Sequence, residues 1–137
     1  MRAIISLGAV LLLAVGASGC SGDTTTSAST TTSVTDTFSS ALALRGSATR
    51  TFKMGTAGTV SIALTSFGNG AQRAGLGVGI TATSAPCSLS QSVVVAASST
   101  PQIVTTADAG TYCVQLYDTG TLTDDTSFTL TVQHPAP

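Results

Sequence analysis

The chain has 137 residues, a formal net charge of −1 and 8% charged residues. This length is enough for one domain. So few charges leave no basic stripe, which argues against nucleic-acid binding driven by phosphate contacts. They also give little long-range electrostatic steering of any charged partner.

Residues 1–19 have the layout of an export signal. Arg2 supplies a positive start, residues 4–15 are apolar apart from Ser6 and Gly8, and small residues occupy positions 16–19. The apolar run is shorter than the roughly 20 residues that a membrane-spanning helix needs. We therefore predict that this segment is cleaved after export and does not serve as an anchor.

Cys20 follows the small residues directly. The sequence Ala-Ser-Gly-Cys at positions 17–20 resembles the bacterial lipobox, in which the cysteine thiol receives a diacylglycerol and cleavage occurs just before it. A lipid thioether would also protect a terminal thiol from oxidation. The alternative is an ordinary signal peptide with an incidental cysteine. The resemblance implies an exported, membrane-anchored lipoprotein that faces the periplasm or the cell surface. In a Gram-negative bacterium, Ser21 would favour the outer membrane.

Residues 20–36 are predicted to form a lipidated tether. Positions 21–34 contain ten Ser or Thr residues and a single charge, so this stretch cannot bury a core. Fully extended, it reaches about 45 Å. The tether would therefore hold a domain clear of the lipid headgroups.

From residue 37 onward, apolar and polar side chains alternate. Val60, Ile62 and Leu64 fall on one face of an extended segment, and Phe128, Leu130 and Val132 do the same near the end. Turn-forming residues separate the candidate strands, which is typical of an all-β sandwich or barrel. We predict about eight strands in a domain of residues 37–134, followed by a disordered tail of residues 135–137. The candidate strands are residues 38–44, 49–54, 58–65, 75–82, 89–97, 101–106, 111–116 and 127–133.

Two cysteines, Cys87 and Cys113, remain within the domain. In an oxidising exported compartment such a pair indicates a disulfide. A metal site would need two more ligands, and His134 is the only histidine. Cys113 shares its face with Gln115, opposite the apolar positions, so we expect the disulfide on the outer side of a sheet.

Candidate catalytic and metal-binding groups are few. His134 lies at the end of the last strand, which is a poor place for a general base, and no catalytic residue or enzymatic activity is predicted. The loop that carries Asp118, Asp124 and Asp125 is rich in the oxygen donors that calcium prefers. The alternative for this loop is a solvated connection between two strands, and no other cofactor is expected.

Glycines alternate at positions 75, 77 and 79. No helix is expected after them, so they are not a dinucleotide-binding fingerprint. Glycines on one face of a strand indicate a close approach by another backbone or by a partner. Tight packing between sheets, or a strand lying under a loop, would explain the same pattern.

Two segments carry a resemblance to a known family. Ala-Gly-Thr-Tyr-Cys-Val-Gln-Leu-Tyr-Asp at positions 109–118, followed by Ser-Phe-Thr-Leu-Thr-Val-Gln-His-Pro at positions 127–135, resembles the bacterial pre-peptidase C-terminal domain. The likeness covers about residues 38–134. It implies a jelly-roll-like antiparallel β-sandwich of the kind that is usually appended to secreted peptidases and other exported enzymes.

No enzyme domain accompanies the sandwich in this sequence. We therefore expect a cell-envelope lipoprotein whose β-sandwich is a non-enzymatic binding or structural module. Its expected partners are the membrane, through the lipid, and an envelope protein or glycan. The alternative is a calcium-stabilised accessory or carbohydrate-binding module that acts with a secreted peptidase or glycosidase.

Overall fold

The computed structural model describes residues 30–137. All of its regular elements are β-strands, as the alternating sequence predicts. The eight strands are β1 (Ser33–Leu42), β2 (Ser47–Met54), β3 (Gly58–Phe67), β4 (Arg73–Ile80), β5 (Ser88–Ala96), β6 (Ile103–Ala107), β7 (Gly110–Tyr117) and β8 (Thr126–Pro135).

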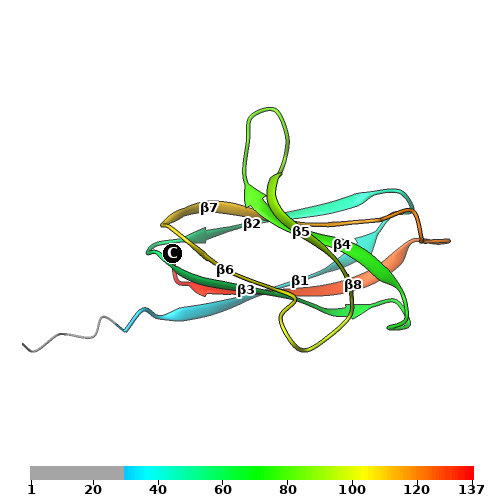
Figure 1. Cartoon of the computed structure of the whole chain (residues 1–137), viewed down its shortest axis with the longest axis horizontal. Coiled ribbons are helices and arrows are strands. Elements are labelled where there is room, and N and C mark those ends of the chain that lie inside the picture. Colours follow the sequence, from blue (N-terminus) through cyan, green and yellow to red (C-terminus); the bar gives the residue numbers. More distant parts are fainter. Residues whose placement is uncertain (1–29) are drawn as a thin grey trace, which may run out of the picture.

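The strands form two antiparallel sheets that pack face to face (Figure 1). One sheet has the order β1-β8-β3-β6 and the other has the order β2-β7-β4-β5. The pairs β1–β8, β2–β7, β3–β6 and β4–β5 follow from a chain folded back on itself between β4 and β5. Rolling this ribbon up adds the pairs β3–β8 and β4–β7. The result is the jelly-roll arrangement of a β-sandwich.

Every predicted strand is present, but the domain extends beyond both of its predicted boundaries, residues 37 and 134. β1 begins at Ser33, inside the segment assigned to the tether. β8 ends at Pro135, and the backbone of Ala136 bonds both Thr32 and Gly55, at 2.8 and 2.9 Å. These backbone hydrogen bonds hold the end of the chain against the sandwich, which corrects the prediction of a disordered tail.

The core lies between the two sheets and is built from the inward positions of each strand. Leu64 and Leu130 from one sheet and Leu76 and Leu116 from the other are at most 2% exposed. Burial of a leucine side chain contributes about 1.5–3 kcal/mol to stability. The alternation identified in the sequence therefore supplies the main stabilising term of the sandwich.

Tyr112 fixes the start of β7. Its hydroxyl donates a hydrogen bond to the carbonyl oxygen of Asp108 at 2.9 Å, four residues upstream. Its ring stacks on Phe52 of the neighbouring strand β2, with 5.8 Å between centroids. This tyrosine-corner arrangement closes the turn from β6 into β7.

Candidate binding surface

The structure confirms the disulfide between Cys87 and Cys113. Cys113 lies on β7 and Cys87 immediately precedes β5, with β4 between these two strands. Both cysteines are buried, yet neither belongs to the cluster of side chains between the sheets. The disulfide thus crosses β4 on the outer side of the sheet, where the alternation predicts it.

The alternating glycines of β4 lie beneath other parts of the same chain. A Cβ atom on Gly75 would meet the ring of Tyr117, and one on Gly77 would meet the Leu89 side chain. At Gly79 it would lie 1.9 Å from the backbone oxygen of Ser88. The chain itself therefore makes the close approach that the glycines indicate, and this face is not free for a ligand.

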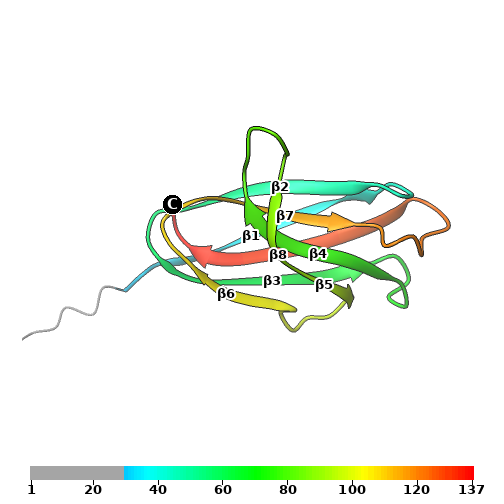
Figure 2. The same ribbon diagram turned by 45° about the horizontal axis from the view of Figure 1, so that its top comes forward.

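Gly79 explains how the disulfide reaches across β4. Gly79 pairs with Cys113 in the ladder, so both residues face the outer side. The backbone of Ser88, directly after Cys87, lies over Gly79 at a distance that no side chain at this position would allow. The loop of residues 81–87, which projects from the sandwich in both ribbon views, is thereby tied down at its end (Figures 1 and 2).

The three aspartates of the predicted calcium loop make separate contacts with the chain. Within residues 30–137, no group of three or more His, Cys, Asp or Glu side chains is placed to hold a metal ion. Both carboxylate oxygens of Asp118 accept backbone N–H groups, and Asp125 accepts the N–H of Leu44 at 2.9 Å. Asp124 accepts the hydroxyl of its neighbour Thr123. These contacts use both oxygens of Asp118 and one oxygen each of Asp124 and Asp125, and calcium binding by this loop stays a prediction.

These aspartates fasten the loop between β7 and β8 to the turn between β1 and β2. Asp118 accepts the N–H of Arg45 at 2.9 Å and donates its own N–H to the oxygen of Gly46. Arg45 has a φ of 56°, a left-handed conformation that few residues other than glycine adopt. The carboxylate thus stabilises a strained turn in a neighbouring segment.

The same hydrogen bonds shift the acidity of Asp118. Partial desolvation acts to raise the pKa of this carboxyl, whereas the backbone N–H groups of Arg45, Gly120, Leu122 and Thr121 act to lower it. The hydrogen bonds prevail, so the pKa of Asp118 lies below its ordinary value of 3.8. The carboxylate therefore stabilises the fold at pH above that ordinary value, and this contribution is lost as the pH falls through the lowered pKa.

Replacement of Asp118 by Asn is expected to lower the melting temperature at neutral pH. An amide NH₂ would face backbone donors that the carboxylate now satisfies. The difference from wild type should disappear at acidic pH, once the wild-type carboxyl is protonated. Thermal melts from pH 7 down to acid would measure this. Asp124→Asn is the control, since its carboxylate accepts only a neighbouring hydroxyl, and an equal effect of both variants would contradict the assignment.

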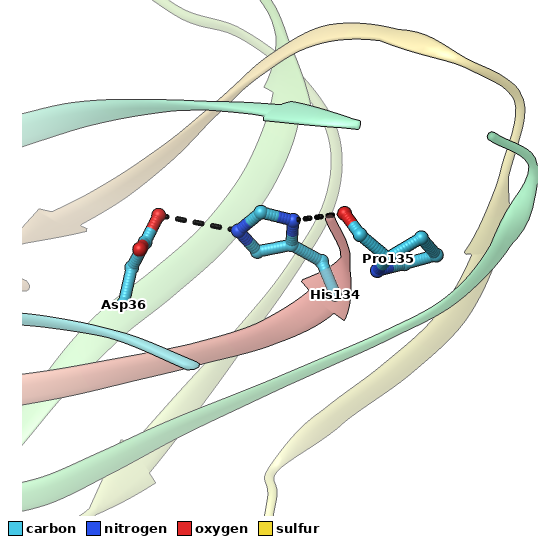
Figure 3. Close-up of polar contacts among 3 residues, drawn as sticks. All are labelled: Asp36, His134 and Pro135. Carbon is cyan, nitrogen blue, oxygen red and sulfur yellow. Dashed lines mark hydrogen bonds and ion pairs between the residues drawn. The ribbon is translucent and has the colours of Figure 1, made fainter. Parts of the chain in front are cut away.

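His134 occupies an inward position of β8 and is 2% exposed. Its Nε2 lies 3.1 Å from Oδ2 of Asp36 and its Nδ1 lies 2.7 Å from the oxygen of Pro135 (Figure 3). The ring also packs 5.0 Å from that of Phe52. The contact to Asp36 connects β8 to β1, and both ring nitrogens are engaged.

A cleft that sequence reasoning missed opens between the two sheets, with a volume of about 190 Å³. Its buried side is apolar, formed by Phe52, Val60 and Val78. Exposed polar side chains of the two edge strands β5 and β6 stand at its other side, among them Gln91 and Thr106. An apolar interior with a few polar groups around it is typical of small binding sites.

The cleft belongs to a side of the sandwich that carries no charge. Residues 74–107, which include most of β4 and all of β5 and β6, contain no Asp, Glu, Lys, Arg or His. The exposed large hydrophobic residues of this stretch are Ile80, Val93, Val94 and Val104. Elsewhere in the part of the chain that the structure describes, Leu44 is the only one. We call residues 74–107 the uncharged side. Its long run without charged residues is the feature of the sequence that could have indicated this surface.

A second, more open hollow of about 310 Å³ lies beside the start of β1. Small hydroxyl side chains dominate it, including those of Ser33, Thr59 and Ser61. It contains no charged or aromatic side chain, and it lies next to the point where the preceding segment enters the sandwich. It therefore offers less to a ligand than the cleft between the sheets.

The signal segment, Cys20 and the first part of the tether lie outside the described residues, so their assignments stay predictions. In residues 30–137 no helix has the length and apolar character that crossing a bilayer requires.

Comparison with known proteins gives no match to a protein family, to a curated protein or to a solved structure.

Proposed function

We propose that this chain is an envelope lipoprotein, anchored through Cys20, whose β-sandwich is a non-enzymatic binding module. The export signal and the lipobox-like sequence support the anchoring. The resemblance to pre-peptidase C-terminal domains is part of this proposal, and the jelly-roll strand order agrees with it. The partner is an envelope protein or glycan.

The distribution of charge and exposed apolar side chains is the observation that supports binding. Soluble surfaces normally intersperse charges, and a concentration of exposed apolar side chains marks an interaction site. On the uncharged side, Ile80 is 56% exposed and Val104 is 60% exposed. The opposite edges of the sheets carry charges, with Asp36 on β1 and Lys53 on β2. The uncharged side is therefore the binding surface in this proposal.

Sedimentation with isolated cell envelopes tests the binding surface. The chain from Ser21 onward, which lacks the lipid, is expected to sediment with envelopes of its own host. Introducing charge with Ile80→Lys and Val104→Lys together should reduce the bound fraction several-fold. Thr37→Lys, an exposed change on β1, is the matched control and should bind as wild type does. Equal binding by both variants would contradict the proposal.

Lipid labelling tests the anchor separately. Growth with labelled palmitate should label the full chain and place it in the membrane fraction. Cys20→Ser should remove both the label and the membrane association, because the thiol is the attachment point. Persistent labelling of that variant would contradict the assignment of Cys20.

A further inference from the structure

β5 is an edge strand with one side open. It pairs with β4, and no other strand among residues 30–137 pairs with its opposite side. An edge strand presents a row of backbone N–H and C=O groups, which another extended strand can satisfy. The chemistry of this edge therefore selects a β-strand as its occupant.

Of the features that usually protect an edge, β5 has only a bulge in its first part. Charged residues interrupt β1 and β2, which carry Asp36 and Lys53 respectively, whereas β5 contains neither charge nor proline. A bulge at Ser90 distorts its first part, where the register with β4 shifts. From Gln91 to Ala96 the ladder is regular, and the side chain of Gln102 takes only the carbonyl oxygen of Ala96, so residues 91–95 remain suited to pairing.

We propose that β5 pairs antiparallel with β5 of a second copy of the chain, joining the two sheets into one. This inference rests on the proposed function of the uncharged side, and it names a partner for that side. A two-fold axis through β5 makes the strand its own complement. Because β5 carries no charge, no like charges face each other across the joint.

The side chains on both faces of β5 suit such an interface between two strands. Val93 pairs with the core residue Leu76, so it points to the inner face, and Val94 points to the outer face. They are 39% and 49% exposed, which leaves apolar surface for the second copy to cover. The regular segment is short, so pairing depends on a high local concentration. Anchoring of many copies in one membrane supplies that concentration.

Cysteine crosslinking of the full chain in its own membranes tests the proposal. Ser92 is exposed on β5, and the disulfide occupies the other two cysteines of the domain. Ser92→Cys, treated with a short bismaleimide, is expected to give a species of twice the monomer mass. Ser40→Cys, exposed on the edge strand β1 at the other side of the sandwich, should remain monomeric.

A lysine on the edge provides the second measurement. In the Ser92→Cys background, Val94→Lys should reduce the dimer several-fold, because two ammonium groups would meet near the two-fold axis. Thr37→Lys on β1, at the far edge of the sandwich, should leave the dimer in place. Both positions are exposed, so both variants should fold, and melting curves would verify this.

Each outcome decides between the two proposals. A monomer at Ser92→Cys, equal crosslinking at Ser40→Cys, or insensitivity to Val94→Lys would overturn the pairing of two copies. A Ser92→Cys adduct with a different protein would also overturn it, while the proposed role of the uncharged side would stand. Failure of the envelope-binding test with Ile80→Lys and Val104→Lys would instead remove the proposed function.

Discussion

Replacing Gly79 with Ala is expected to cost the domain about 3 kcal/mol of unfolding free energy, at the upper end of typical overpacking penalties. The added methyl group would lie 1.9 Å from the oxygen and 2.6 Å from the carbonyl carbon of Ser88. These are backbone atoms of a segment fixed by β5 and by the disulfide. Relieving this clash therefore requires movement of the whole segment that crosses β4. Urea unfolding of the oxidised protein would measure the loss.

Gly77→Ala is the matched control on the same strand. Its methyl group would meet the two terminal carbons of Leu89 at 2.7 and 2.9 Å, which can rotate away, and the backbone oxygen of Gln91 at 3.1 Å, which needs only a small shift. The loss should be about 1 kcal/mol or less, since alanine also lowers the conformational entropy of the unfolded chain. Equal losses for the two variants would show that the crossing over Gly79 is not rigid.

Removal of the disulfide with Cys87→Ala and Cys113→Ala together is expected to lower the unfolding free energy by about 3.5 kcal/mol, the loop-closure estimate for this separation. The two cysteines are 26 residues apart, so the bond restricts a substantial part of the unfolded chain. Denaturant unfolding of the double variant, beside wild type with and without a reductant, would measure the change.

The reduced wild type is the control for this experiment, and it should resemble the double variant. The effects of Gly79→Ala and of disulfide removal should not add, because both act on the segment that crosses β4. Without the disulfide, this segment can lift away from an alanine at position 79. A loss below about 1 kcal/mol in the double variant would mean that the ladder between β4 and β5 alone holds the crossing.

Most of the fold was predictable because most strands turn alternate apolar side chains toward the core. The rows headed by Val60 and Phe128 identify their strands without further information. The order of strands in the sheets depends on contacts between distant segments, which local alternation does not encode. The jelly roll was expected from the family resemblance, and the structure shows it.

The first strand was recognised only in part, and the reason is local. β1 lies at an edge, and Val34, Asp36 and Phe38 are all only half-buried. A charged residue at Asp36 breaks the apolar row because it pairs with His134 on β8. A strand of this kind, rich in Ser and Thr, has the same composition as a tether.

The contacts of the aspartate loop were not predictable for a different reason. Oxygen-rich loops can serve a cation or their own backbone, and the sequence does not distinguish the two uses. The deciding partners of Asp118 and Asp125 include Arg45 and Leu44, more than 70 residues away along the chain. Only the folded arrangement brings that turn to the aspartates.

The folded-back ribbon has a consequence for the time course of folding. Its strand pairs range from neighbours such as β4 and β5 to β1 and β8, where Ser33 meets Pro135. Loop-closure entropy delays the most distant pairings, and topologies dominated by them fold in milliseconds to seconds. We expect the hairpin of β4 and β5 to assemble early and β1 to dock last, so that the strand nearest the start of the chain completes the domain.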